Sequence, residues 1–146
     1  MRGLIHVLTF KIIFTVLGSC VPLLLLSESS LQWLGFPVPQ PILFLRLLGM
    51  AYAALIVGYA LGLKDAKRGI YPANAVWVGI VSNAGAALIL SFAAISGTWA
   101  HWGALAQALM WSSLVCLTAI TAGLISFGPF DLRLETEISR KFAELP

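Results

Sequence analysis

Charged residues are scarce in this sequence, and their scarcity limits the class of protein. Only 10% of the 146 residues are Asp, Glu, Lys or Arg, and 60% are hydrophobic. An average soluble domain is about 25% charged, and a soluble fold of this length could not bury so much apolar surface. The composition therefore indicates an integral membrane protein, for which we expect membrane lipids as partners and no nucleic acid.

The apolar residues fall into long uninterrupted stretches. Four of them, at about 4–26, 42–63, 74–96 and 103–127, each reach the ~20 residues that a helix needs to cross a bilayer. They use most of the chain, so three short loops and a tail remain, without room for a soluble catalytic module. The sequence thus predicts an all-α protein, with residues 1–130 forming a bundle of four transmembrane helices. Pro22 is expected to kink the first helix, because it cannot donate to the Gly18 carbonyl.

The tail after the fourth span has a helical pattern of its own. Gly128-Pro129 ends the span, and Asp131 can cap a new helix whose apolar residues recur at spacings of three to four. We therefore predict a short amphipathic cytoplasmic helix over 131–146. Its charges nearly cancel, which favours contact with a protein neighbour over attraction to anionic lipid.

Lys and Arg lie on one side of this topology. Outside the spans, they occur before the first span, between the second and third spans and in the tail, and the other two loops have none. Cytoplasmic loops retain positive charge, so both termini are expected in the cytoplasm, with segments 27–40 and 97–102 outside. We expect a bacterial inner membrane as the location. Aromatic residues at both boundaries agree: Trp33, Trp99 and Trp102 outside, and Tyr59, Tyr71 and Trp77 inside.

The cysteines, histidines and acids are too few, or too far apart, for several kinds of membrane chemistry. Cys20 and Cys116 lie at different depths, unlike the redox pair of a disulfide oxidoreductase. All six acids lie outside the spans, whereas a small proton-coupled exporter needs an intramembrane carboxylate. His6 and His101 lie at opposite ends, which excludes a bis-His haem or a metal site. We therefore expect neither an enzyme nor a metalloprotein.

Lys11 and Arg46 are the two charged residues inside predicted spans, where an ionised group costs several kcal/mol unless it snorkels or finds a partner. Arg46 lies near the outer boundary, where an ion pair with Glu28 would join the first two helices. Alternatively, Arg46 and the stiff Pro-rich loop 36–41 hold an anionic head group. Lys11 lies close enough to the cytoplasmic side to snorkel, and contact with a ligand or partner subunit is the alternative.

Small and polar residues are expected to face the interior of the bundle, because helices in lipid associate by close packing and polar contacts. Read at 3.6 residues per turn, the four stripes are Lys11, Thr15, Gly18 and Pro22; Arg46, Gly49, Ala53 and Ala60; Gly79, Asn83, Ala86 and Ala94; and Ala108, Ser112, Cys116, Ala119 and Gly123. Gly58 and Gly62 form a GxxxG pattern on another side of the second helix. That pattern permits contact with a second subunit.

Three polar residues, Tyr52, Asn83 and Ser112, come to a similar mid-depth. We interpret Asn83 first as a hydrogen-bonding bridge between helices. If the bundle contains a cavity, however, these three would line it together with Arg46 and Lys11, which suits a mostly apolar ligand with one or two polar atoms. A lipid, an isoprenoid or a quinone fits that description.

The run Phe44-Leu45-Arg46-Leu47-Leu48-Gly49, followed by Gly58-Tyr59, resembles the DoxX-like small four-helix membrane proteins. These proteins often place an Arg and a Gly early in a helix that follows an outer loop. The resemblance covers about twenty residues and the overall topology, and it implies a role in redox or quinol-linked membrane complexes. It supplies no catalytic residue that can be carried over to this chain.

These observations predict a non-catalytic accessory or assembly subunit of a larger membrane complex, with a membrane protein or a second copy of the chain as its partner. The alternative is a binding or carrier protein for a lipid-like, isoprenoid or quinone ligand within the bundle. The ordinary test of the first is co-purification, and that of the second is retention of a small molecule.

Overall fold

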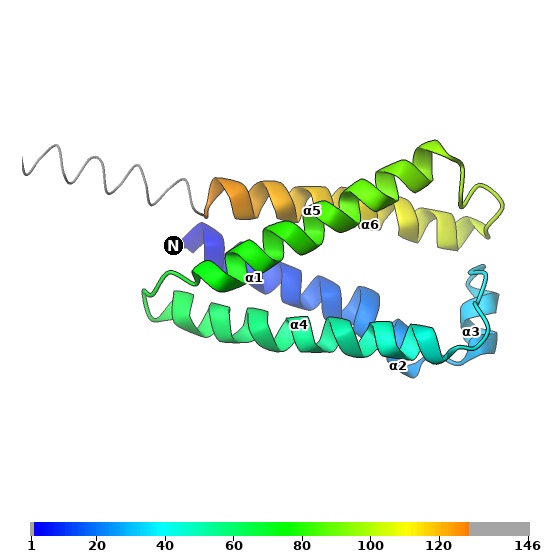
Figure 1. Cartoon of the computed structure of the whole chain (residues 1–146), viewed down its shortest axis with the longest axis horizontal. Coiled ribbons are helices and arrows are strands. Elements are labelled where there is room, and N and C mark those ends of the chain that lie inside the picture. The colour runs from blue at the N-terminus through cyan, green and yellow to red at the C-terminus, as the bar shows by residue number, and fades with distance from the viewer. Residues whose placement is uncertain (1, 129–146) are drawn as a thin grey trace, which may run out of the picture.

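The computed structural model describes residues 2–128, and within them every regular element is a helix. Four helical segments, Arg2–Leu25, Leu43–Lys67, Ala73–Ile95 and Ala104–Ser126, are long and apolar enough to cross a membrane. They confirm the predicted four-helix bundle, and the chain is an integral membrane protein (Figure 1). The predicted tail helix over 131–146 lies outside the described residues.

The first span is one helical rod made of three segments: α1 (Arg2–Thr15), the π-helix η1 (Val16–Cys20) and α2 (Val21–Leu25). In the π-helix, the Val21 amide donates to the Val16 carbonyl, five residues earlier. Pro22 has no N–H to offer the preceding turn, and a wider turn just before a proline accommodates that missing bond. The disturbance expected from Pro22 therefore begins one turn earlier in the chain, as a change of helix type.

A short helix, α3 (Glu28–Trp33), follows in the segment that was predicted to be an outer loop. The Ser27 hydroxyl caps it by accepting a hydrogen bond from the Ser30 amide at 3.1 Å, and Glu28 lies in the first turn, where an acid suits the helix dipole. Leu31 is buried and holds the helix against the bundle. The Ser-Glu pair is the signal from which this helix could have been predicted.

The other three spans are α4 (Leu43–Lys67), α5 (Ala73–Ile95) and α6 (Ala104–Ser126). The helix α4 runs four residues past its expected end, since Lys64 and Lys67 are good helix formers and suit the negative end of the helix dipole. Gly69 then ends it with a φ of 81°, a left-handed conformation that glycine adopts without strain.

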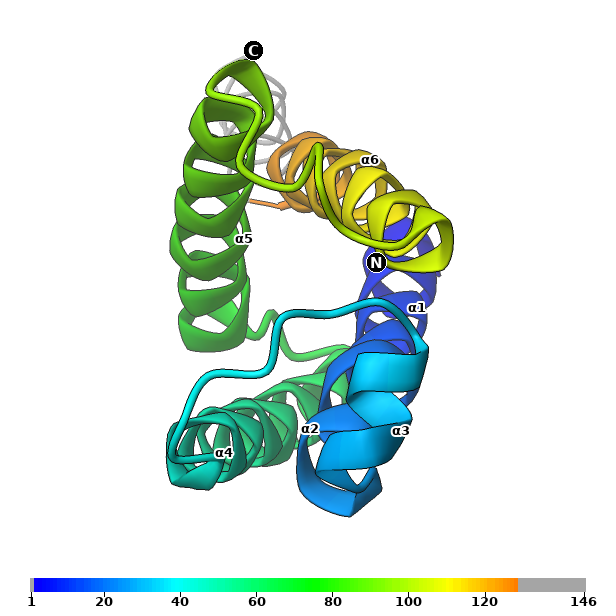
Figure 2. The same ribbon diagram turned by 90° about the vertical axis from the view of Figure 1, so that its right-hand side faces the viewer.

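The helices pack as two pairs that meet mainly at one end of the bundle. The first span packs against α4, and α5 packs against α6. Figures 1 and 2 show that α4 and α5 lie close where they are joined and diverge toward their other ends. We call the half that contains Arg2, Lys67 and Ala73 the proximal half, and the half that contains α3 and the loop 34–41 the distal half.

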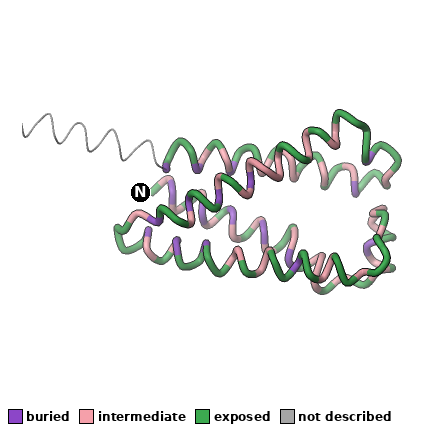
Figure 3. Tube along the Cα trace, viewed as in Figure 1, coloured by how far each residue is buried: buried purple, intermediate pink, exposed green. Residues whose placement is uncertain are grey.

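The described core lies in the proximal half. Its buried side chains come from all four spans: Leu4, Leu8, Tyr59, Val76, Ile120 and Leu124. The buried residues of α5 are Val76, Gly79 and Asn83, all in the first half of that helix (Figure 3). Further along α5, Phe92 and Ile95 are 76% and 86% exposed within the chain. Packing within the chain therefore fixes the proximal half more firmly than the distal half.

Contacts between loops join the distal ends of the two helix pairs. The Gly103 amide donates to the Gly35 carbonyl at 3.0 Å, and the Phe36 and Trp102 rings meet edge to face at 5.8 Å. A Cβ atom on Gly35 would lie 2.5 Å from the Gly103 Cα, so the two backbones touch only because neither residue has a side chain. The expected outer loop thus bridges α3 to the start of α6.

Candidate functional site

A buried lysine lies at the centre of the most polar cluster in the described spans. The Lys11 ammonium donates to the Asn83 Oδ1 at 2.7 Å and lies 4.3 Å from the centroid of the Tyr59 ring. An amide oxygen and the face of an aromatic ring both stabilise a cation. Lys11 is only 3% exposed, so the prediction that it snorkels to the cytoplasmic surface is wrong. Its ammonium instead joins α1, α4 and α5.

The neighbours of Lys11 are held in place by further hydrogen bonds. The Asn83 amide nitrogen donates to the Gly79 carbonyl one turn earlier, which leaves the Asn83 Oδ1 to face Lys11. The Tyr59 hydroxyl lies 2.9 Å from the Ser82 Oγ, and Ser82 in turn donates to the Gly79 carbonyl at 3.3 Å. Tyr59 is 1% exposed and belongs to the core, so its assignment to the aromatic belt is also wrong.

Gly79 lets the helices approach one another closely at this cluster. A Cβ atom there would lie 2.7 Å from the Leu124 Cδ1 and 3.5 Å from the Tyr59 Cε1. The expected inward stripe on α5 is therefore present at Gly79 and Asn83, both of which are buried. On α6 the stripe is displaced, because Ser112 and Ala108 are exposed while Ile120 and Leu124 are buried.

Arg46 binds the end of the first span and not the acid that was expected to pair with it. Its Nη1 donates to the Leu23 carbonyl at 2.6 Å and its Nη2 to the Leu26 carbonyl at 2.7 Å. The last carbonyls of a helix have no partner within the helix, and a guanidinium with two parallel N–H donors satisfies them well.

Glu28 has partners of its own in the distal loop. Its Oε1 accepts hydrogen bonds from the side-chain amides of Gln40 and Gln32. Over residues 2–128, the structure places no ion pair between Glu28 and Arg46. The predicted link between the first two helices is present, but backbone carbonyls accept it and the Glu28 carboxylate does not.

The predicted ligand-binding set is only partly brought together. Lys11 and Asn83 are in contact, whereas Arg46 makes its bonds in the distal half. Ser112 is exposed, and its hydroxyl donates to the Leu109 carbonyl of its own helix at 2.9 Å. Tyr52 is half-buried on α4. These positions do not form the single polar cavity that the sequence suggested.

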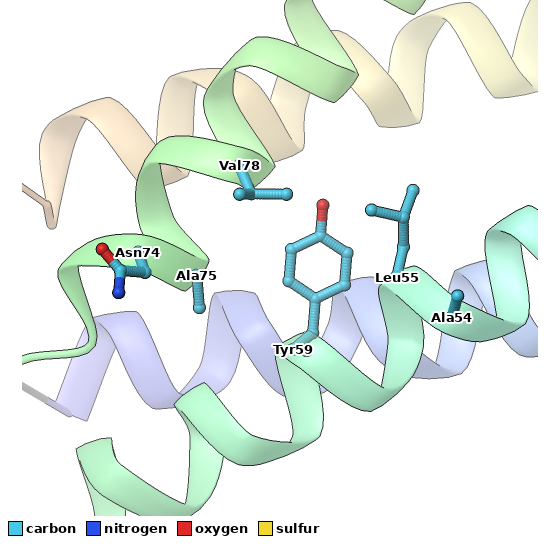
Figure 4. A pocket seen from close by; sticks show the side chains of 7 residues that line it. Ala54, Leu55, Tyr59, Asn74, Ala75 and Val78 are labelled. Carbon is cyan, nitrogen blue, oxygen red and sulfur yellow. The ribbon is translucent and has the colours of Figure 1, made fainter.

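A different cavity, of about 190 Å³, lies between α4 and α5 in the proximal half (Figure 4). Its walls are almost entirely apolar, and it opens on one side; the lining residues are Ala54, Leu55, Gly58, Tyr59, Asn74, Ala75 and Val78. The GxxxG pattern explains it. Gly62 packs directly on the Ala75 Cβ, whereas an added Cβ on Gly58 would meet nothing within 4 Å.

Comparisons with protein-family models, with curated proteins and with solved structures find no match. Within residues 2–128, the chain also shows no group of three or more His, Cys, Asp or Glu side chains that could hold a metal ion. The function must therefore be inferred from the geometry of the bundle itself, and the resemblance to DoxX-like proteins stays a prediction.

Proposed function

We propose that this chain is a non-catalytic accessory or assembly subunit of a larger membrane complex. The observation that carries this proposal is that the strongest polar groups within the spans are already bound to other groups of the chain. Lys11 and Asn83 bind each other, and Arg46 binds the carbonyls of Leu23 and Leu26. Groups committed to contacts between helices stabilise a scaffold, whereas catalysis needs a nucleophile and a base that are free to act.

The distal half supports a role in assembly. Large apolar side chains on both helix pairs stay exposed within the chain there, among them Phe44, Leu88, Ile89, Phe92 and Ile95. Lipid covers such surfaces in an isolated subunit, and the helices of a neighbour cover them in a complex. The resemblance to DoxX-like proteins favours a redox or quinol-linked complex.

Co-purification tests this proposal most directly. Extracted in a mild detergent and purified through an affinity tag, the chain should migrate as a complex with at least one other membrane protein or with a second copy of itself. The control is an unrelated membrane protein with four spans and the same tag, purified in parallel. It identifies proteins that bind non-specifically to any helix bundle. A strictly monomeric chain without a specific companion, across several mild detergents, would contradict the proposal.

We also propose that the chain lies in a bacterial inner membrane with both termini in the cytoplasm. The basic residues Lys64, Lys67 and Arg68 at the proximal end support this orientation. In intact cells, an impermeant thiol reagent should label Ser30→Cys and leave Lys67→Cys unlabelled. Lys67 is exposed at the last position of α4, and Ser30 is half-buried in the short helix α3, so each is open to the reagent. The reverse labelling pattern would invert the orientation.

A second candidate function is the binding of a lipid-like molecule, which the cavity between α4 and α5 favours. Its position differs from the site expected from sequence, because Arg46, Asn83 and Ser112 do not line it. Native mass spectrometry of the detergent-purified chain should then show a retained small molecule. A spectrum that contains only the bare chain in every mild detergent would argue against this second function.

A further inference from the structure

The cavity between α4 and α5 has the size and chemistry of a site for hydrocarbon. Its volume of about 190 Å³ exceeds that of an engineered ~150 Å³ apolar cavity that stays dry and binds benzene. Two of the lining residues, Tyr59 and Asn74, have polar side chains: the Tyr59 hydroxyl is paired with Ser82, and Asn74 lies at the proximal end of the cavity. Deeper than Asn74, the walls offer no free strong donor or acceptor, so the part of the ligand that enters there must be apolar.

The cavity lies at the depth of the lipid chains in one leaflet, and its wall on α4, from Ala54 to Tyr59, spans about 8 Å by helical rise. At its proximal end is Asn74, the second residue of α5, and at its deep end is Ala54, near the middle of α4. Ala54 lies 13 residues before Lys67, or about 20 Å by helical rise, and one leaflet contributes about 15 Å of hydrocarbon. In Figure 4, Asn74 and Ala54 lie at opposite ends of the group of lining residues.

Positive charge lies at the end of the bundle where the head group of such a lipid would be. The segment 64–68 ends α4 and leads toward Asn74, and it carries Lys64, Lys67 and Arg68 against one acid, Asp65, for a net charge of +2 (three minus one). All three basic side chains are exposed. Basic clusters beside transmembrane helices attract anionic head groups. The charge therefore selects an anionic lipid over a neutral one.

We propose that this cavity binds one acyl chain of an anionic phospholipid, whose head group lies against the basic segment 64–68. The proposal rests on the second candidate function, lipid-like binding, and gives it a ligand class and a site. Gly58 and Ala54 keep the cavity open for the acyl chain, and Lys67 and Arg68 supply positive charge for the head group.

Two kinds of variant test the two parts of the ligand separately. Gly58→Leu and, independently, Ala54→Leu fill the cavity from α4; both positions are exposed, and a Cβ on Gly58 meets no atom within 4 Å. Gly85→Leu on α5 is the matched control, because a Cβ there also meets nothing within 4 Å and Gly85 does not line the cavity. Lys67→Gln combined with Arg68→Gln removes the head-group charge, with Arg2→Gln as a control at the same end of the bundle.

The measurements are lipid retention by native mass spectrometry and the rise in melting temperature on adding lipid to the purified chain. The probes are palmitoyl-oleoyl phosphatidylglycerol and the corresponding neutral phosphatidylcholine. The wild type, Gly85→Leu and Arg2→Gln should retain phosphatidylglycerol preferentially and melt higher in its presence. The cavity-filling variants should lose both effects, and the charge variant should weaken retention about fivefold for each charge removed.

Each of the following results would overturn the proposal. Equal retention of phosphatidylglycerol by Gly58→Leu, Ala54→Leu and Gly85→Leu would show that the cavity does not bind the acyl chain. Equal retention of both lipids, or equal behaviour of the charge variant and Arg2→Gln, would remove the basic segment as the site of the head group. A wild type that retains neither lipid but another small molecule would overturn this inference and leave the second candidate function standing, whereas a wild type that retains nothing would contradict both.

Discussion

The two halves of this bundle are held together by different means. In the proximal half, four spans bury a shared core around the contact between Lys11 and Asn83. In the distal half, the helix pairs separate, and the described links between them are backbone and ring contacts of loops, such as Gly103 to Gly35. Arg46 fixes the end of the first span within one pair only. The difference teaches that a charged group need not weaken a membrane bundle when it lies where the helices already pack.

The largest expected effect comes from removing the hydrogen-bond acceptor of Lys11. Asn83→Leu leaves a buried ammonium without its amide oxygen, and should lower the free energy of unfolding by roughly 1.5–3 kcal/mol, the usual worth of a bond to a charged group. Asn74→Leu, an exposed Asn on the same helix, is the matched control and should cost little. Unfolding in mixed micelles by added denaturing detergent provides the measurement.

A double substitution sharpens this test. Lys11→Met combined with Asn83→Leu replaces both polar partners by apolar ones, and should recover most of the lost stability. If Asn83→Leu is no worse than Asn74→Leu, or if the double variant is as unstable as Asn83→Leu alone, the contact does not hold the proximal half together.

The second effect concerns the close approach of α4 and α5. Gly62→Leu must push α5 away, because a Cβ at this position collides with the Ala75 Cβ. We expect a loss of about 1–3 kcal/mol, as for overpacking of a core. Gly58→Leu, one turn earlier on the same helix, should be nearly neutral for stability in lipid-free detergent, since a Cβ there meets nothing within 4 Å. Equal melting temperatures for the two variants would show that the helices are not in contact at Gly62.

A smaller effect is expected in the distal half. Arg46→Ala removes two hydrogen bonds to the carbonyls of Leu23 and Leu26, but these groups are only partly buried, so the expected cost is about 1 kcal/mol. Glu28→Ala should cost a few tenths of that, because its partners are exposed glutamines. Thermal melting of both single variants and of the double variant distinguishes an Arg46 bound to backbone carbonyls from an Arg46 paired with Glu28. Equal losses that do not add would restore the ion pair predicted from sequence.

The smallest effect lies at Tyr71, in the loop between α4 and α5. Its hydroxyl is buried without a hydrogen-bond partner, and burial raises the pKa of Tyr71 above its usual value of about 10. The folded state then holds this proton more tightly than the unfolded state, so stability is intact below pH ~10 and falls as the pH rises beyond it. Tyr71→Phe should be neutral or slightly stabilising at pH 7, and should lose less stability than the wild type between pH 9 and 11. Parallel curves for both proteins would exclude a buried hydroxyl.

The fold could be predicted because membrane spans depend on length and apolarity, which are properties of the sequence alone. The contacts of the polar groups were harder to predict. Arg46 had backbone carbonyls within reach, but those become acceptors only because the first span ends at Leu25, and the sequence offered Glu28 as the obvious partner. Lys11 meets Asn83 because its long side chain reaches from α1 past the Tyr59 ring of α4 to α5, and that reach depends on how closely the helices pack at glycines such as Gly79.

The π-helical turn Val16–Cys20 changes the spacing of buried residues along the first span. Buried positions along this span follow a helical step at Leu4, Leu8, Lys11 and Thr15, and the next buried position, Cys20, comes five residues after Thr15. The turn thus holds one residue more than an α-helix needs. A Cβ added to Gly18, within this turn, would meet no atom within 4 Å. A homologous chain that lacked this one residue could form a plain α-helix here and still bury the residues that correspond to Thr15 and Cys20, so an alignment gap at Gly18 would mark a change of helix type and not a change of fold.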